Sequence, residues 1–274
     1  MPSLRTADAE LHYEERGQGD PVVLLHGLGS STEDWEPQIA ALAPRYRVIA
    51  IDMRGSGRSR DLTHPGGPFS IATFAADTVA VIDHLGAAPA HIVGLSMGGM
   101  VAFQLAVDHA RVVRTMTIIN SGPALVPRGW QEHAMIATRL ALAATWGPKG
   151  MAKLLAPKLF PDNAQLRRTF RERMARNDRQ AYAATQRAAV GFDVVARIGT
   201  IEAPALIVAS DHDYTPVARK QGYARLMRNA RVVVVPDSRH ALPIEDPRKL
   251  QPILDAFLEE HRNTRGGQDH AASR

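Results

Sequence analysis

The stretch HIVGLSMGG, residues 91 to 99, decides the fold of this chain. Its first half is a short apolar run typical of a buried strand, and helical spacing begins at Met97. Between the two lies the pattern Gly-x-Ser-x-Gly, centred on Ser96. At a strand-to-helix junction this pattern predicts a sharp, strained turn that raises the serine hydroxyl above a sheet, where Gly94 and Gly98 avoid two colliding Cβ atoms. The alternative is a plain helix cap bracketed by glycines.

Short apolar runs rich in β-branched residues recur along the chain, with helical stretches between them. The strand candidates are residues 22–25, 48–51, 91–95, 112–119, 205–209 and 231–235, and the helix candidates are residues 35–42, 71–85, 97–109, 216–227 and 247–261. This alternation predicts an α/β fold in which crossover helices join parallel strands. Residues 11–16 alternate in polarity, which favours an antiparallel edge strand.

The strand rhythm stops between residues 122 and 200, where Ala, Leu, Arg and Gln dominate and helical spacing takes over. We therefore expect one α/β core, formed by residues 1–121 and 201–262, with a helical cap inserted at residues 122–200. Proline breaks a helix interior, so three prolines should divide the cap. They are Pro148, Pro157 and Pro161. Residues 263–274 hold little apolar surface and are expected to form a flexible tail.

The composition excludes several kinds of chemistry and of location. The chain has no cysteine, which excludes disulfides, thiolate-bound zinc and a cysteine nucleophile. The first 17 residues carry six charged side chains and no apolar core, so no signal peptide is predicted. The most apolar later stretch, residues 135–146, is too short to span a bilayer. These features predict a cytoplasmic protein that makes no membrane contact.

The formal charge of +5 is concentrated in the insertion, which has 13 Lys or Arg against 5 Asp or Glu. Solvated helix faces explain such charge, and an anionic substrate or partner is the alternative. The basic residues lack the interleaved aromatic residues of a platform for single-stranded nucleic acid, so no nucleic-acid partner is expected. The sequence leaves the oligomeric state open.

Two loops after the last strand candidates offer a base and an acid. His240 follows the run at residues 231–235, where a loop can return a side chain to the carboxyl edge of the sheet. Asp211 and Asp213 follow the preceding run. Asp213 is the preferred acid because it lies further along its loop, while Asp211 could cap the turn. The chain order Ser, Asp, His is the one expected when the serine lies on a strand-to-helix turn.

A glycine-containing loop, His26-Gly27-Leu28-Gly29, follows the strand candidate at residues 22–25. We expect the backbone amides of Leu28 and Met97 to form an oxyanion hole, because amides aimed at a reacting carbonyl stabilise the charge that develops on its oxygen. His26 is expected to hold the loop rather than to act as a base.

Five segments together resemble the α/β-hydrolase superfamily, in its esterase, enol-lactone hydrolase and cofactor-free haloperoxidase branch. They are HGLG at 26–29, DMRGSGRS at 52–59, GLSMGG at 94–99, PALIVASDHD at 204–213 and SRHALPIEDP at 238–247. The resemblance covers residues 10–121 and 203–260. It implies a mostly parallel eight-stranded sheet flanked by helices, with an inserted helical cap, and it places the catalytic acid on Asp213.

The chain also departs from the family pattern. Ser210 and Arg239 stand where the family usually has glycine, and Pro216 arrives one residue early, which keeps Asp211 as the alternative acid. A serine at position 96 separates the chain from relatives with an aspartate nucleophile. The resemblance therefore implies neither an epoxide hydrolase nor a haloalkane dehalogenase.

These observations predict a serine hydrolase that uses no cofactor or metal and cleaves a small carboxylic ester or lactone. Ser96 would be the nucleophile, His240 the base and Asp213 the orienting acid, with an acyl-enzyme intermediate. Hydrolysis of carbon–carbon bonds and peracid formation use the same triad and stay open, and a small-molecule receptor is the alternative of another class. Six apolar residues could line the acyl site or pack as ordinary core: Met100, Leu125, Trp130, Met135, Leu142 and Trp146.

Overall fold

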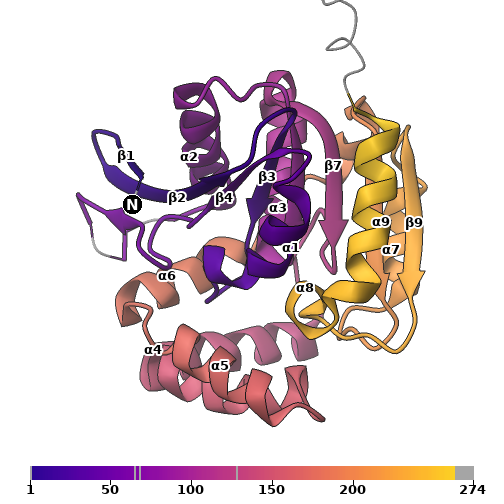
Figure 1. Cartoon of the computed structure of the whole chain (residues 1–274). Helices are drawn as coiled ribbons and strands as arrows, with labels where there is room; N and C mark the ends of the chain where they lie inside the picture. Colours follow the sequence, from indigo (N-terminus) through magenta and orange to yellow (C-terminus); the bar gives the residue numbers. More distant parts are fainter. Residues whose placement is uncertain (1, 65, 68, 128, 263–274) are drawn as a thin grey trace, which may run out of the picture.

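A nine-stranded sheet forms the centre of the protein in the computed structural model, which describes residues 2–64, 66–67, 69–127 and 129–262 (Figure 1). The strand order is β1-β2-β4-β3-β6-β7-β8-β9, and β5 pairs with β2. The strands are β1 (Ser3–Arg5), β2 (Ala9–Arg16), β3 (Pro21–Leu25), β4 (Arg47–Ile51), β5 (Arg60–Asp61), β6 (Ala90–Leu95), β7 (Val113–Ile119), β8 (Ala205–Ser210) and β9 (Ala230–Val235). This is the predicted α/β-hydrolase arrangement, with β5 as an additional short strand.

The strands β4, β3, β6, β7, β8 and β9 run parallel to one another, and β1, β2 and β5 form antiparallel pairs. β2 runs antiparallel to β4, as predicted, but it is not the edge strand, because β1 pairs with its outer side. The polarity alternation of β2 predicts one apolar and one polar face, and it does not reveal whether another strand lies beside it. Residues Leu25, Gly94 and Ile118 lie side by side in register, so β3, β6 and β7 end at the same edge.

Helices cover both faces of the sheet, which is why strands such as β6 and β8 are buried along their whole length. On one face α2 (Ile71–His84), α3 (Met97–Asp108) and α7 (Val217–Ala224) pack into one apolar cluster, and on the other α1 (Glu36–Leu42) and α9 (Pro247–Glu260) pack into a second. The shorter elements are η1 (Thr32–Trp35), η2 (Ala110–Val112), η3 (Val195–Thr200) and α8 (Leu242–Glu245).

Three helices, α4 (Trp130–Leu159), α5 (Ala164–Met174) and α6 (Arg179–Ala189), lie between β7 and β8 in the sequence, where the cap was predicted. Figure 1 shows α4 and α5 beyond one edge of the sheet. Their small apolar core contains Ala143, Met151, Ala152, Met174 and Tyr182.

The prolines divide the cap only in part. α4 breaks at Gly147, whose φ of 62° and ψ of −171° are not helical, and Pro148 begins the second half. Pro161 follows the helix end. The prediction for Pro157 is wrong, because it lies inside α4. It is close to the C-terminus of the helix, so its missing N–H removes a hydrogen bond only from the last turns.

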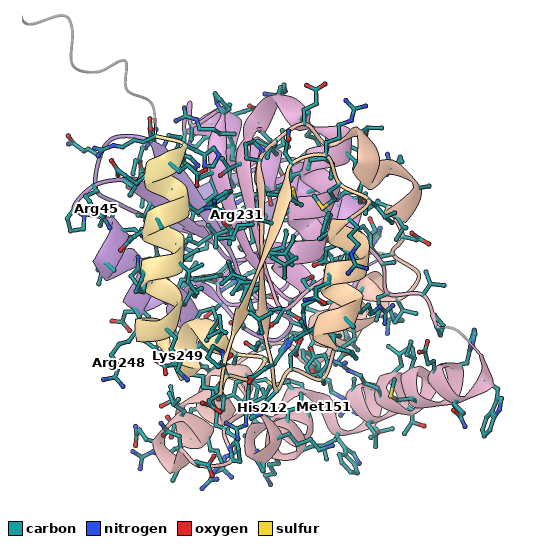
Figure 2. All side chains as sticks on the ribbon, turned by 90° about the vertical axis from the view of Figure 1, so that its right-hand side faces the viewer. Arg45, Met151, His212, Arg231, Arg248 and Lys249 are labelled. Atoms are coloured by element: carbon teal, nitrogen blue, oxygen red, sulfur yellow. The ribbon has the colours of Figure 1, made fainter. Side chains whose placement is uncertain are left out.

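The inserted helices contact the core through α6, where Ala181 lies beside Gly55 and Tyr182 beside Gly29, and through the end of α5. The Asn177 Nδ2 donates to the Gly29 carbonyl at 2.9 Å, and the Arg173 guanidinium donates to Asp34 at 2.8 Å. Figure 2 shows the first half of α4 projecting outward from the body of the molecule. Within the described residues, no helix is both long and apolar enough to cross a membrane. The predicted tail at residues 263–274 lies outside the described residues.

Candidate active site

Ser96 lies on a strained turn between β6 and α3. Its φ is 53° and its ψ is −114°, a backbone conformation that side-chain-bearing residues rarely adopt. Neighbouring segments hold this conformation: the Ser96 amide donates to the Ile119 carbonyl at 2.9 Å, and the Ser121 hydroxyl donates to the Ser96 carbonyl at 2.5 Å. The turn therefore has the shape that the sequence pattern predicts.

The two glycines of the pattern are required by close backbone approach. A Cβ atom on Gly94 would lie 2.3 Å from the Gly98 carbonyl oxygen, and a Cβ on Gly98 would lie 2.1 Å from the Leu25 carbonyl oxygen. Both distances are far below van der Waals contact. The turn at Ser96, here called the elbow, and the end of β3 can therefore pack this closely only with glycine at both positions.

The loop after β3 is held by the DMRGSGRS segment. His26 is completely buried; its Nδ1 pairs with the Gly27 carbonyl at 2.7 Å, and its Nε2 accepts from the Met53 amide at 3.0 Å. The Asp52 carboxylate accepts from the amides of Thr32 and Arg58 at 2.7 Å and 2.9 Å. Both ring nitrogens of His26 are occupied by the backbone, which fits its predicted role in holding the loop.

The segments that carry the predicted oxyanion donors lie beside Ser96. Met97 is the first residue of α3, and the amide at this position has no acceptor within the helix. A Cβ on Gly27 would lie 3.5 Å from the Ser96 Cβ, so the loop that carries Leu28 passes directly against the serine. The role of the Leu28 and Met97 amides as an oxyanion hole stays a prediction.

The predicted acid and base are in direct contact. The Asp213 Oδ1 lies 2.7 Å from the His240 Nδ1, and the Asp213 side chain is completely buried. Its Oδ2 accepts from the Lys220 Nζ at 2.6 Å and from the Thr215 hydroxyl. Burial raises the pKa of Asp213, but the hydrogen bonds from His240, Lys220 and Thr215 outweigh it and hold this pKa below its ordinary value.

The alternative acid has a different task in the structure. The Asp211 carboxylate accepts from the amides of Asp237 and Ser238 at 2.9 Å and 3.0 Å, so it closes the turn after β9. With His212 and Asp237 it also forms an exposed group whose possible metal-ligand atoms lie within 4.8 Å of one another. The contacts of Asp211 with the backbone favour Asp213 as the partner of His240.

Tyr214 lies between His240 and Ser96. Its hydroxyl is 2.6 Å from the His240 Nε2, and its ring lies over the imidazole with 4.1 Å between centroids and 32° between planes. The Ser96 side chain lies close enough to this hydroxyl to exert a lowering effect on the pKa of Tyr214. Across the described part of the chain, no direct hydrogen bond joins His240 to Ser96.

Asn120 joins the loop of His240 to the sheet. Its Nδ2 donates to the carbonyls of Arg239 and His240 at 3.1 Å and 3.0 Å, and it exchanges two 2.8 Å hydrogen bonds with Ser210. The Ser210 hydroxyl thus accepts a hydrogen bond from Asn120. Position 210 is one of those where this chain departs from the glycine that is usual in the family.

Sequence reasoning missed Asn120, Tyr214 and Lys220. Asn120 carried a signal, because a polar residue directly after a buried parallel strand lies at the functional edge of such a sheet. Tyr214 is adjacent to the predicted acid, but a neighbour in sequence need not share its surroundings. Lys220 lies in a helix candidate where its charge favoured an exposed position, so no sequence signal pointed to it.

The six apolar residues proposed for the acyl site do not gather in one place. Met100 packs against the main core and Leu142 against the cap core, and Leu125 is half-buried. The other three are exposed: Trp130 over 78% of its surface, Met135 over 64% and Trp146 over 55%. These three are neither ordinary core nor walls of an enclosed pocket in this conformation, and substrate binding by the six residues stays a prediction.

A cavity of about 200 Å³ lies where the cap meets the core. Most of its lining residues are polar types, among them Ser31, Asp52, Arg58 and Arg173, and none belongs to the predicted triad. It lies beyond the Gly29 end of the loop, so it does not mark where the reacting bond would bind.

Comparison with known proteins identifies the family. The sequence model for the alpha/beta hydrolase fold matches residues 20–247. The chain is 34% identical over 261 residues to the "Putative carbamate hydrolase RutD" of Variovorax paradoxus (strain S110), which covers 90% of this chain and 96% of that protein. It is 27% identical over 264 residues to the (E)-2-((N-methylformamido)methylene)succinate hydrolase of Acinetobacter baylyi, covering 90% and 94% of the two chains.

A solved structure gives the same result. The enol-lactonase from Burkholderia xenovorans LB400 superposes with a TM-score of 0.86 at 27% identity, covering 94% of this chain and all of the other. The family match spans most of the chain, and these relatives are hydrolases. The protein therefore belongs to the alpha/beta hydrolase fold family and is an alpha/beta hydrolase enzyme.

Proposed function

We propose that this protein is a serine hydrolase that cleaves a small carboxylic ester or lactone. The Ser96 Oγ would attack the carbonyl carbon while its proton passes to the His240 Nε2, and the carbonyl electron pair would move to the oxygen, near the amides of Leu28 and Met97. Collapse of this intermediate would expel the alcohol, which takes the proton from His240. Water, activated by the same imidazole, would then release the acid.

One observation carries the proposal. A buried carboxylate, Asp213, holds the Nδ1 of His240 at 2.7 Å, and the Nε2 on the other side of the ring faces the Tyr214 hydroxyl, which the Ser96 side chain approaches. An imidazole whose Nδ1–H is fixed by a carboxylate has an unprotonated Nε2, which is the form that a general base requires.

The ester or lactone class is supported by the enol-lactonase that shares the fold. A carbamate is the second candidate, because the relative at 34% identity is named a carbamate hydrolase. Both are acyl transfers to water, and the same serine, imidazole and amide donors could catalyse either. The carbon–carbon hydrolase, perhydrolase and receptor alternatives also fit these groups, so the assay has to separate them.

The test is a substrate panel assayed with the wild type and Ser96→Ala. The panel holds nitrophenyl esters, simple lactones, an aryl carbamate and a vinylogous diketone, together with covalent labelling by a fluorophosphonate. We expect steady turnover of an ester or lactone, with turnover and labelling lost in Ser96→Ala and kept in Ser3→Ala, which changes an exposed serine. Undiminished labelling of Ser96→Ala would refute the proposed nucleophile. A single burst without turnover would instead favour a receptor.

A further inference from the structure

The Tyr214 side chain occupies the reacting face of His240. It belongs to the loop between β8 and α7, directly after Asp213. Its ring covers the imidazole at 4.1 Å, and its hydroxyl reaches the Nε2 at 2.6 Å. The Ser96 side chain lies near the same hydroxyl and acts to lower its pKa. The phenol therefore occupies the Nε2 that the proposed mechanism requires to meet Ser96 directly.

The protonation pattern fixes the direction of these hydrogen bonds. The Asp213 carboxylate can only accept, so the Nδ1 of His240 carries the proton and its Nε2 accepts. The Tyr214 hydroxyl must then donate to Nε2, and its oxygen can accept from the Ser96 hydroxyl. The phenolic oxygen thus occupies the position from which a reacting oxygen exchanges a proton with His240. In the first half of the reaction that oxygen belongs to the leaving alcohol, and in the second half it belongs to the attacking water.

We propose that Tyr214 is a gate on His240, which substrate has to displace before Ser96 can transfer its proton. The inference rests on the proposed serine hydrolase function. In the free enzyme the phenol fills the place of the leaving group and of the hydrolytic water. In the complex the leaving-group side of the substrate takes that place, and Ser96 meets the Nε2 directly.

The packing of Tyr214 permits this movement. The residue is 63% exposed, whereas Tyr182 and Tyr223 are buried at 2% and 7% exposure. Its side chain is held by the hydrogen bond and the ring contact with His240, both directed at the reaction site. A neutral hydrogen bond and an aromatic contact each change an equilibrium about 5-fold. Binding of a small substrate can supply that difference.

The second-order rate constant for labelling by a fluorophosphonate measures access to the Ser96–His240 pair without requiring the natural substrate. We expect Tyr214→Phe, which loses the hydroxyl but keeps the ring, to be labelled about 5-fold faster than the wild type. Tyr214→Ala should be labelled on the order of 10-fold faster. Tyr46→Phe is the matched control, because it removes a tyrosine hydroxyl that contacts Glu259 in the last turn of α9, and its rate should not change.

A structure of the phosphonylated enzyme gives a second readout. We expect the Tyr214 hydroxyl to have left hydrogen-bond distance of the His240 Nε2. An unchanged labelling rate in both Tyr214 variants, or a phenol still bound to Nε2 in the phosphonylated enzyme, would overturn the gate. A loss of 10-fold or more in Tyr214→Phe would also overturn it, because the hydroxyl would then assist proton transfer. Labelling that persists in Ser96→Ala refutes the proposed function instead, so the two failures are distinguishable.

Discussion

The Lys220 Nζ lies 2.6 Å from the Asp213 Oδ2, at a place where the two side chains are only 1% and 0% exposed. The lysine also donates to the Thr215 carbonyl at 2.7 Å, which ties the loop of the acid to α7. Burial lowers the pKa of Lys220, although the neighbouring carboxylate favours its charged form. The carboxylate that contacts His240 is thus itself held by the buried ammonium group of Lys220.

Replacement of Lys220 by methionine should destabilise the protein by roughly 3 kcal/mol, because removal of one partner leaves a buried charge without its counter-ion. Urea unfolding measures the loss. Lys153→Met removes an exposed lysine of the cap and should change the free energy of unfolding by less than about 0.5 kcal/mol. Equal effects of the two substitutions would contradict a buried ion pair at Asp213.

The lowered pKa of Asp213 predicts a particular pH dependence of stability. Its folded pKa lies below the ordinary value of 3.8, so the unfolded chain takes up the proton first as the pH falls. The contribution of Asp213 is therefore complete above about pH 4 and is lost as the pH falls through the folded pKa. The free energy of unfolding, measured from pH 7 to pH 3, should decrease more steeply below pH 4 in the wild type than in Asp213→Asn. Parallel curves would refute this contribution.

Most of the sheet and the turn at Ser96 were predictable because their signals are local. A run such as residues 91–95 is buried on both faces, so its composition alone identifies a central strand. The glycines at 94 and 98 mark a close approach of backbone that no other residue allows. The edge position assigned to residues 11–16 failed, because strand order depends on β1, whose three residues carry no pattern.

The contacts around the predicted acid and base could not be predicted, because they join residues distant in sequence. Asn120 meets His240 across 120 positions, and no local pattern records that the end of β7 lies beside the last loop. Similarly, the apolar composition of α4 did not reveal that Trp130 would be exposed. Its helical spacing predicts the helix, while its exposure depends on where the first half of α4 lies relative to the core.

The side chain of Asn120 should be required for activity more than for folding. Asn120→Gly removes its hydrogen bonds to Ser210, Arg239 and His240 without strain, because the φ of Asn120 is 47° and glycine tolerates positive φ. The loop that carries the imidazole then loses its attachment to β7. We expect kcat to fall on the order of 100-fold with little change in KM, since a shift of about 1 Å in a reacting group has an effect of this size.

The matched control for Asn120 is Asn229→Gly, which removes an exposed side chain whose amide donates to the Glu202 carbonyl. Its kcat should equal that of the wild type. Urea unfolding should show a loss of about 2 kcal/mol for Asn120→Gly, because buried partners are left unsatisfied. A variant at 120 that is destabilised but keeps its full kcat would show that Asn120 serves only stability.

The elbow at Ser96 predicts opposite effects for two glycine-to-alanine substitutions in helices. In Gly98→Ala the new Cβ would meet the Leu25 carbonyl oxygen at 2.1 Å, so α3 must move away from the loop that carries Leu28. In Gly222→Ala, in α7, the Cβ would meet nothing within 4 Å. We expect Gly98→Ala to lose roughly 3 kcal/mol of stability through overpacking, and Gly222→Ala to gain about 0.5–1 kcal/mol from its better helix propensity.

Fluorophosphonate labelling of the folded fraction of the same two variants separates stability from geometry. Movement of α3 carries Ser96 and the Met97 amide away from the Leu28 amide, so the folded fraction of Gly98→Ala should be labelled at least about 100-fold more slowly. Gly222→Ala should be labelled at the wild-type rate. Full labelling of folded Gly98→Ala would mean that the elbow can relax without disturbing the serine, and the close approach of β3 would then serve packing alone.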